Sequence, residues 1–294
     1  MHVHVDSVYD TAKATADHAR SRSKRYAAAC LLGLARRVPY LRQALALRPK
    51  ANATIRSPIR ICLDCNFIGP SQIYPLHQLV GLYRDYRSDA YNQDRCAVEP
   101  SYEKIKDLVG KCQQEIDSRR NNLDDIIDCH VNCKAIQTVL DWGGGEGRFV
   151  PTSLANKSVT ILDYSDEQLV DPSFVRVDAL VEKQQFNYIQ ICHVLEHVSE
   201  PLSLMQEVIS HLNPGGYIYI ESPQDRSNSD LSNFISAPPK MYHFIHEHLN
   251  LYSESALAKL GASLGLRCLH LGSRDLDFGW CRGIVLSGLF VNDS

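Results

Sequence analysis

The pattern of apolar and polar residues changes character near residue 135. Beyond this point, short apolar runs alternate with polar loops and amphipathic segments, which predicts strands and helices that alternate along the chain. The expected helices are Pro201–Leu212 and Ser255–Leu264. Such an alternation implies right-handed crossovers and a parallel sheet covered on both faces, so the predicted fold class is α/β. The five expected parallel strands are Ile136–Asp141, Ser158–Asp163, Phe174–Asp178, Phe186–His193 and Tyr217–Glu221.

The end of the chain carries a different pattern. Two apolar runs, Leu266–Leu271 and Gly283–Phe290, are separated by a charged turn, which favours a hairpin at the end of the sheet. The stretch Ser222–Lys240 is long and polar and contains two adjacent prolines, so it is a candidate lid.

Before residue 135 the apolar residues recur at helical spacing. Residues 1–25 are polar and are expected to be poorly ordered, apart from a helical stretch after Ser7. Residues 26–48 predict a helix pair or a kinked helix around Pro39, and 102–133 predict one or two further helices. The expected organisation is therefore a basic helical N-terminal arm (1–58), a helical cap region with a CxxC motif (59–134) and an α/β domain (135–294).

Composition and charge narrow the function classes. The chain has 294 residues, of which 44% are hydrophobic and 22% charged, as in a soluble globular protein. A net charge of −3 gives no global case for nucleic-acid binding. However, no Asp or Glu occurs between His18 and Leu63, where eleven Lys and Arg residues fall. This basic arm could contact an anionic surface or a larger assembly, although a solvated basic face is the simpler interpretation.

The ten cysteines are irregularly spaced, unlike a secreted disulfide framework, and no apolar run is long enough to cross a membrane. We therefore expect a reducing, cytoplasmic setting. Cys62 and Cys65 have the spacing of half a tetrahedral zinc site. No second pair stands upstream, so plain thiols are favoured over zinc. Other residues that could contribute to zinc binding have irregular spacing: His77, Cys96, Cys112, Cys129 and Cys133.

The stretch Thr138–Phe149 carries the strongest chemical signal. An apolar run ends in Asp141 and enters a loop with four glycines, which predicts a strand, a tight turn and the first turn of a helix. An ordinary glycine-rich loop is the alternative. A nicotinamide dinucleotide fits less well, because a GxGxxG motif starting at Gly143 would place Arg148 at its third glycine.

Three successive strands end in acids: Asp141, Asp163 and Asp178. A single acid here would be an ordinary helix N-cap, but three beside a glycine loop favour a ligand at the carboxyl edge of the sheet. Asp163 could accept hydrogen bonds from both hydroxyls of a ribose. Asp178 could accept one from an adenine amine, with the backbone of Ala179 as a donor.

These motifs, together with Val194–Val198 and the turn Asn213–Gly216, resemble in order and type those of class I S-adenosylmethionine-dependent methyltransferases. The resemblance covers about 135–290 and implies a Rossmann-like, mostly parallel seven-stranded sheet with an antiparallel last strand. It also implies S-adenosylmethionine as the cofactor. Asn187 and Trp142 depart from the usual pattern. The residues assigned to the cofactor by this resemblance are Asp141, Gly143, Gly145 and Gly147 at the methionine end, Asp163 at the ribose, Tyr164, Asp178 and Ala179 at the adenine, and Cys192 and His193 beneath the methyl group.

The catalytic candidates lie in two histidine-rich stretches. His193–His197 formally matches the HxxEH motif of metallopeptidases, but it follows a parallel strand, so that function is rejected. Glu196, His197 and, in the second stretch, His246 are the candidate general bases. His246 or His248 could instead be structural, and no metal ligand is assigned.

The acceptor of the methyl group is the least defined part of this prediction. The CxxC motif followed by the segment Tyr83–Arg95 resembles the arm of sugar methyltransferases, although those carry two such knuckles. Tyr91 and Arg95 could close over the methionine carboxylate. The resulting hypothesis is methyl transfer to a small hydroxylated acceptor, such as a sugar or surface-glycan precursor. The alternatives are a methyltransferase of a non-sugar small molecule and a non-catalytic cofactor-binding scaffold.

Overall fold

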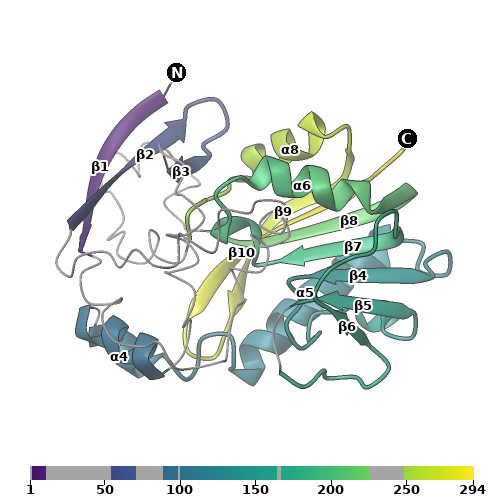
Figure 1. Cartoon of the computed structure of the whole chain (residues 1–294), viewed down its shortest axis with the longest axis horizontal. Coiled ribbons are helices and arrows are strands. Elements are labelled where there is room, and N and C mark those ends of the chain that lie inside the picture. Colours follow the sequence, from purple (N-terminus) through teal and green to yellow (C-terminus); the bar gives the residue numbers. More distant parts are fainter. Residues whose placement is uncertain (1, 11–53, 71–88, 99, 164–166, 225–247) are drawn as a thin grey trace.

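The computed structural model describes residues 2–10, 54–70, 89–98, 100–163, 167–224 and 248–294 (Figure 1). Its main feature is a seven-stranded sheet in the order β6-β5-β4-β7-β8-β10-β9. Strands β6, β5, β4, β7 and β8 pair in parallel, whereas β10 is antiparallel to both of its neighbours. The strands are β4 (Thr138–Trp142), β5 (Ser158–Leu162), β6 (Val175–Val177), β7 (Phe186–Cys192), β8 (Leu212–Gln224), β9 (Arg267–Asp277) and β10 (Arg282–Val291).

This sheet confirms the predicted fold class, including the antiparallel last strand. The hairpin of β9 and β10 lies where the two final apolar runs predicted it. The sheet order also changes direction between β4 and β7, because the chain runs outward from β4 to β6 and then returns to the other side of β4. In open parallel sheets such a switch point forms a crevice for ligands beyond the carboxyl ends of the strands.

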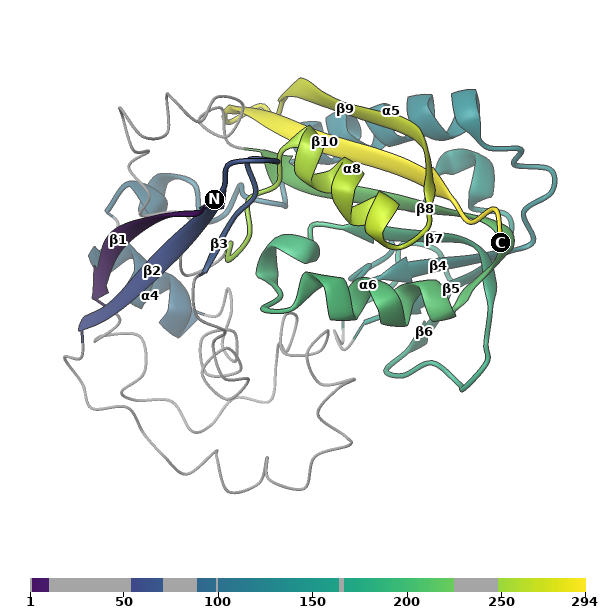
Figure 2. The ribbon, with the colours of Figure 1, turned by 90° about the horizontal axis from the view of Figure 1, so that it is seen from above.

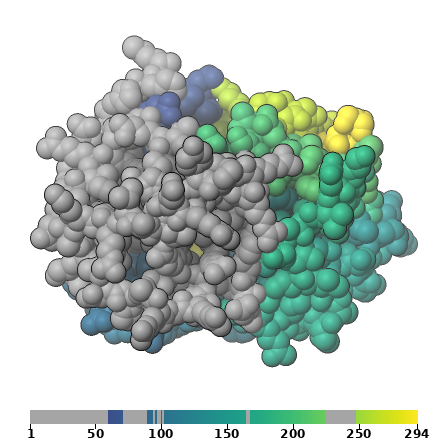
Figure 3. All heavy atoms as spheres, in the orientation of Figure 1, coloured from purple at the N-terminus to yellow at the C-terminus, as the bar shows by residue number. Residues whose placement is uncertain are grey.

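Each face of the sheet is covered by helices, because alternate residues of every strand point to opposite faces. Helix α5 (Gln113–His130) covers one face, and α6 (Pro201–Ser210) with α8 (Glu254–Ser263) covers the other (Figure 2). Val139 accordingly belongs to the core under α5, whereas its neighbour Leu140 belongs to the core under α6 and α8. The described segments of this α/β domain lie together in the space-filling view (Figure 3).

The predicted helical turn after the glycine loop is wrong. Residues 143–151 form turns, and only the short 3-10 helix η2 (Thr152–Leu154) precedes β5. Closely spaced glycines disfavour a helix here, and Pro151 precedes η2. Val150 and Leu154 instead pack directly into the core under α5. Among the described residues, the connections on either side of β6 also lack a helix, so the expected strand–helix alternation is incomplete.

A smaller antiparallel sheet contains β1 (His2–Asp10), β2 (Thr54–Cys62) and β3 (Ile68–Pro70). The described ends of the arm are therefore strands, which corrects the helical expectation for 2–10 and 54–58. Alternating valines near the start favour an extended chain over a helix. The helices expected in 26–48 and most of the candidate lid lie outside the described residues.

The cap region joins the α/β domain through β3. Ile68 and Leu251 exchange backbone hydrogen bonds of 3.1 and 2.8 Å. The region also contains α4 (Asp89–Val98) and the 3-10 helix η1 (Pro100–Lys104) before α5. No helix in the described ranges has both the length and the apolar character that a bilayer crossing requires.

The two departures from the usual motif pattern have structural roles. Asn187 Oδ1 accepts hydrogen bonds from the backbone N–H groups of Gln137 and Thr138, which fixes the start of β4 against β7. Trp142 is buried in the core beneath α6, on the face away from α5. Neither residue is therefore placed to block the glycine loop.

Candidate functional site

The three predicted acids lie at the same edge of the sheet. Asp141 is near the end of β4, and Asp163 and Asp178 directly follow β5 and β6. The Asp163 N–H donates to the carbonyl of Val177 at 3.1 Å, which joins the ends of β5 and β6. Asp141 and Asp163 are buried, whereas Asp178 and Ala179 are exposed at the rim.

The glycine loop is held in a backbone conformation that glycine adopts readily. Gly143, Gly145 and Gly147 have φ angles of +72°, +56° and +80°, in the left-handed region where other residues are strained. A Cβ atom on Gly144 would lie 2.3 Å from the carboxyl carbon of Asp141. The loop therefore wraps closely around the Asp141 carboxylate.

Neighbouring strands fix this loop in place. The Gly145 N–H donates to Asp163 Oδ2 at 2.8 Å, and the Arg176 guanidinium donates to the Gly145 carbonyl at 2.6 Å. The Gln190 side chain donates to the carbonyl of Phe149 at 3.0 Å. The loop is thus positioned from β5, β6 and β7 together.

Asp141 is unusual because it is 1% exposed and, within the described part of the chain, neither carboxylate oxygen accepts a hydrogen bond of normal geometry. Burial raises the pKa of Asp141 to about 7, and the nearby Asp163 carboxylate adds to this rise, while Gln190 moderates it. A buried carboxylate without partners costs several kcal/mol when charged. This carboxylate is thus suited to a cationic ligand group.

The end of β7 carries the second notable geometry. His193 has a φ of +55°, which is rare for a residue with a side chain and often marks a functional position. Its ring lies between two buried acids: Nε2 is 3.2 Å from Glu221 Oε1, and Nδ1 is 3.4 Å from Glu196 Oε1. Burial and the nearby Arg119 lower the pKa of His193, against the opposing effect of Glu221.

A buried polar network beneath α5 supports His193 from behind. Arg119 Nη2 and Nε donate to Glu221 Oε1 at 2.7 and 2.9 Å. Tyr219 donates to the other Glu221 oxygen at 3.0 Å and contacts the hydroxyl of Ser287. Although burial acts in the opposite direction, the Arg119 charge and His193 hold the pKa of Glu221 at about 2. Glu221 is therefore a fixed negative charge beside His193.

Arg119 and Glu221 have no functional assignment from the sequence. The available signal for Glu221 is that the run Tyr217–Glu221 also ends in an acid, at the same edge as the other three. Arg119 gives no such signal, because its partner is 102 positions away along the chain.

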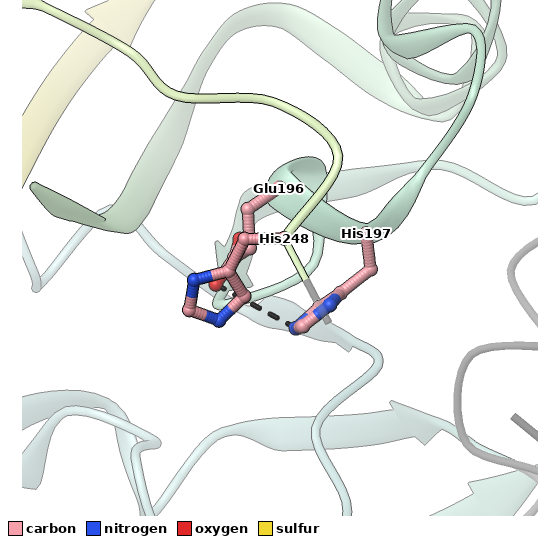
Figure 4. A group of neighbouring side chains, drawn as sticks. All are labelled: Glu196, His197 and His248. Carbon is pink, nitrogen blue, oxygen red and sulfur yellow. Dashed lines mark ion pairs between the residues drawn. The ribbon is translucent and has the colours of Figure 1, made fainter. Parts of the chain in front are cut away.

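The predicted base candidates Glu196 and His197 lie in the 3-10 helix η3 (Leu195–His197), which follows His193. Figure 4 shows their side chains converging with that of His248, from the segment that begins at residue 248. Glu196 Oε1 is 3.7 Å from His197 Nε2, and the rings of His197 and His248 are 5.1 Å apart. Burial raises the pKa of Glu196 to about 8. The predicted Tyr164 and His246 lie outside the described residues.

The CxxC turn and the residues after it contact the segment that follows His248. The Ser253 hydroxyl donates to the Cys65 carbonyl at 2.5 Å, and the rings of Phe67 and Tyr252 are 5.2 Å apart. A backbone hydrogen bond lowers the pKa of the Cys62 thiol, whereas burial raises that of Cys65. Among the described residues, no other metal-ligating side chain completes a group of three with the two thiols.

Tyr91 and Arg95 contact each other. Arg95 donates to the Tyr91 hydroxyl at 3.4 Å, and its guanidinium lies 3.6 Å from the centre of the Tyr102 ring. Both residues belong to α4, and their predicted closure over the cofactor stays a prediction.

Comparison with known proteins identifies the family of the chain and supports its fold. The model of the Methyltransferase domain family matches residues 94–271, more than half of the chain, and this range contains the glycine loop, the three acids and η3. The chain belongs to this family. Its mostly parallel seven-stranded sheet with an antiparallel last strand is the fold that the resemblance to class I methyltransferases implied.

Solved methyltransferase structures are similar to this chain at low sequence identity, and the first of the two below shares its fold. The 1,6-didemethyltoxoflavin-N1-methyltransferase of Burkholderia thailandensis, solved with 1,6-didemethyltoxoflavin and S-adenosylhomocysteine, is 16% identical with a TM-score of 0.52, over 79% of this chain and 98% of that one. The N-methyltransferase NodS of Bradyrhizobium japonicum, solved with S-adenosylhomocysteine, is 14% identical with a TM-score of 0.41, over 60% and 87% of the two chains. No curated protein matches the sequence.

Proposed function

We propose that this methyltransferase-family protein transfers a methyl group from S-adenosylmethionine to a small hydroxylated acceptor, of which a sugar is our preferred class. The observation that carries the proposal is the Asp141 carboxylate. It is buried under a loop of left-handed glycines, next to Asp163, and has no hydrogen-bond partner of normal geometry among the described residues. An orphaned buried acid enclosed by backbone fits the ammonium of a bound amino acid, because charge pairing offsets the cost of burial.

The remaining strand-end residues fit the other parts of this cofactor. The Asp163 carboxylate, which follows the strand beside that of Asp141, would accept hydrogen bonds from the ribose hydroxyls. Asp178 and Ala179, exposed at the rim beyond β6, would contact the edge of the adenine, and Tyr164 its face. Gly143, Gly145 and Gly147 let the backbone approach the methionine end without side chains in the way.

When bound, S-adenosylmethionine supplies an electrophilic methyl group on a sulfonium. In the transfer, the acceptor oxygen would bond to the methyl carbon as the carbon–sulfur bond breaks, and the electron pair of that bond would stay on sulfur. The hydroxyl proton leaves to a base. Positioning of the two reactants can contribute up to about 7–11 kcal/mol to such a reaction. The residues that end β7 and form η3 would hold the acceptor at this point.

His193, Glu196 and His197 are the described residues that we place on the acceptor side, with His246 as a further candidate base. The preference for a sugar rests on the resemblance of the CxxC arm to that of sugar methyltransferases. It is supported by the packing of the CxxC turn against Ser253 and Tyr252, five or fewer residues from His248.

Calorimetric titration with S-adenosylmethionine tests this function. We expect one site per chain, and we expect Asp163→Ala to weaken binding at least about tenfold because the charged acceptor of two ribose hydroxyls is lost. Asp128→Ala, which removes an exposed acid on α5, should bind like the wild type. Absence of binding by the wild type, or full binding by Asp163→Ala, would contradict the proposal.

The acceptor is identified in a separate experiment. Extracted metabolites and surface glycans from cells with and without the protein are compared by mass spectrometry. We expect a compound that is lighter by one methyl group when the protein is deleted. A methylated protein or nucleic acid in place of a small molecule would exclude the acceptor class proposed here.

A further inference from the structure

The carboxylate of Glu196 has no role in the fold that the described contacts explain. Its side chain is 0% exposed, and within the described part of the chain neither oxygen has a hydrogen-bond partner of normal geometry. Buried polar groups are almost always hydrogen-bonded, and an unpaired buried acid is costly. A missing ligand is a direct explanation for a carboxylate held in this way.

Three imidazoles lie near this carboxylate. That of His193 lies between Glu196 and Glu221, whereas those of His197 and His248 form a group of possible metal ligands with Glu196. One ligating atom from each of Glu196, His197 and His248 can be chosen so that all three lie within 4.8 Å of one another. The ligand atoms of a single first-row metal ion are about 3–4 Å apart, because each bond is about 2.0–2.2 Å long. Small side-chain rotations would therefore bring these three atoms onto one ion (Figure 4).

The backbone around the three side chains is fixed by hydrogen bonds between two distant segments. The N–H groups of Leu249 and Asn250 both donate to the carbonyl of Glu196, at 2.6 and 3.0 Å. The Asn250 side chain donates to the carbonyls of Leu195 and Val198, at 2.9 and 2.6 Å. His248 is thus held next to η3 by four hydrogen bonds that involve none of the three ligating side chains.

We propose that Glu196, His197 and His248 bind one divalent first-row transition-metal ion, with coordination positions left open for oxygen ligands. Two imidazole nitrogens and one carboxylate oxygen suit ions such as Zn²⁺, Mn²⁺, Fe²⁺ or Co²⁺, rather than Ca²⁺, which prefers an all-oxygen shell. Because Glu196 is adjacent to His193 at the end of β7, the ion would lie on the acceptor side of the site.

The use of this ion rests on the proposed function. A hydroxyl oxygen of the acceptor in an open position would lose its proton at a lower pH, because a bound divalent cation stabilises the oxyanion. The ion would then take over the activation assigned above to a side-chain base. Glu196 and His197 would act as ligands in that arrangement, which explains why two candidate bases stand side by side.

The test uses the full chain, without an affinity tag, after chelator treatment and gel filtration. Cobalt chloride is titrated and followed by visible absorption, with a parallel calorimetric titration of manganese chloride. The background is a Cys62→Ser/Cys65→Ser variant, so that the CxxC thiols cannot bind the metal. We expect one ion per chain, without the absorption bands of cobalt–thiolate bonds.

Two variants and a matched control locate the ion. Glu196→Gln and His248→Ala should each weaken binding about 100-fold or more, because even loss of an outer-shell partner costs 10–100-fold. His270→Ala removes an imidazole that also lies beside another one, with ring centres of His130 and His270 5.6 Å apart. It should bind the ion unchanged. Stoichiometric binding that survives both ligand variants would place the ion elsewhere and overturn the proposal.

A measurement on the chain with its ligands intact covers the case in which a variant fails to fold. Bound Co²⁺ should shift the NMR signals of the His197 and His248 rings most strongly, with a smaller shift for the nearby ring of His193. Bound Mn²⁺ should enhance the relaxation of water protons through the open positions. The absence of metal binding, or of either effect, overturns the site as proposed. Titration of the same samples with S-adenosylhomocysteine separates the two ideas: metal binding without cofactor binding contradicts the function alone, and the reverse contradicts the metal site alone.

Discussion

At the scale of single residues, the glycine loop and Asp141 depend on each other. The chain comes so close to the carboxylate that Gly144 has no room for a methyl group, although its neighbours and not Gly144 itself have the left-handed backbone angles. The sequence shows four glycines but not which of them is required by contact and which by conformation. That distinction needs the position of the Asp141 side chain.

Adding one carbon atom at Gly144 should therefore affect cofactor binding. We expect Gly144→Ala to weaken S-adenosylhomocysteine binding about tenfold or more, because Asp141 or the loop must shift from its position. Gly272→Ala is the control, since its Cβ atom would make only ordinary contacts at 3.7 Å or more. Calorimetry measures both, and equal affinity of the two variants would contradict the close fit.

Asp141 should also give the protein without cofactor a particular pH dependence. Its pKa is about 7 in the folded chain and about 3.9 when unfolded, so the folded state binds more protons between these values. The free energy of unfolding should then fall as pH rises from about 4 to about 7, by up to about 4 kcal/mol.

Asp141→Asn should remove this part of the pH dependence, since the amide does not ionise. Urea unfolding of both proteins at several pH values provides the measurement. Parallel curves for the two proteins would show that Asp141 is not protonated in the folded chain.

At the scale of elements, the five parallel strands and the helices α5, α6 and α8 lie where the sequence predicted them, whereas the helical turn after the glycine loop was predicted wrongly. Apolar runs such as 158–163 and 186–193 define strands because a buried parallel strand needs a continuous apolar segment. The missing helix after the glycine loop could not be read in the same way. Val150 and Leu154 are apolar in either case, and only the structure shows that they pack on the sheet from a bend and a short 3-10 helix.

Part of the candidate site could be predicted from the sequence, and part of it could not. Strand-end acids are visible in the sequence because each follows an apolar run, and they were predicted. Contacts between elements leave no such pattern: His248 lies next to η3 through hydrogen bonds of the backbone, and Arg119 reaches Glu221 from another element. Side-chain pairing at this range requires the folded chain.

The contact of α5 with β8 is the clearest energetic test at this scale. Arg119→Met should destabilise the fold by about 3–5 kcal/mol, because Glu221 is left as a buried and less compensated charge. Adding Glu221→Gln should recover part of this loss. Denaturant unfolding of the single and double variants gives the coupling energy, and strictly additive effects would contradict the pairing.

At the scale of the whole molecule, the cap region and the α/β domain are joined although they are distant in sequence. The CxxC turn and β3 connect the cap region to the α/β domain through Leu251, Ser253 and Lys259.

Charge is unequally distributed along the chain: eleven basic residues lie between His18 and Leu63, in a chain whose net charge is −3. The remainder of the chain is therefore strongly acidic.

This asymmetry predicts salt-dependent binding to anionic surfaces. The protein should sediment with phosphatidylserine vesicles at about 0.1 M salt and be released at about 1 M, where the Debye length shrinks from about 10 Å to about 3 Å. Arg36→Glu/Arg37→Glu should weaken this binding. Lys104→Glu/Lys111→Glu, with the same change of charge at exposed positions outside the basic run, should weaken it less. Equal loss in both variants would indicate a net-charge effect without a role for the arm.

The buried acid under the glycine loop has a final thermodynamic consequence. At pH 7, about half of the molecules carry a proton on Asp141, because its pKa is about 7. An ammonium group that binds beside it requires the ionised form, so cofactor uptake should release about half a proton into the medium. The observed heat of binding should consequently differ between Tris and phosphate buffers at this pH, in proportion to their ionisation enthalpies. Identical heats would place the ammonium away from Asp141.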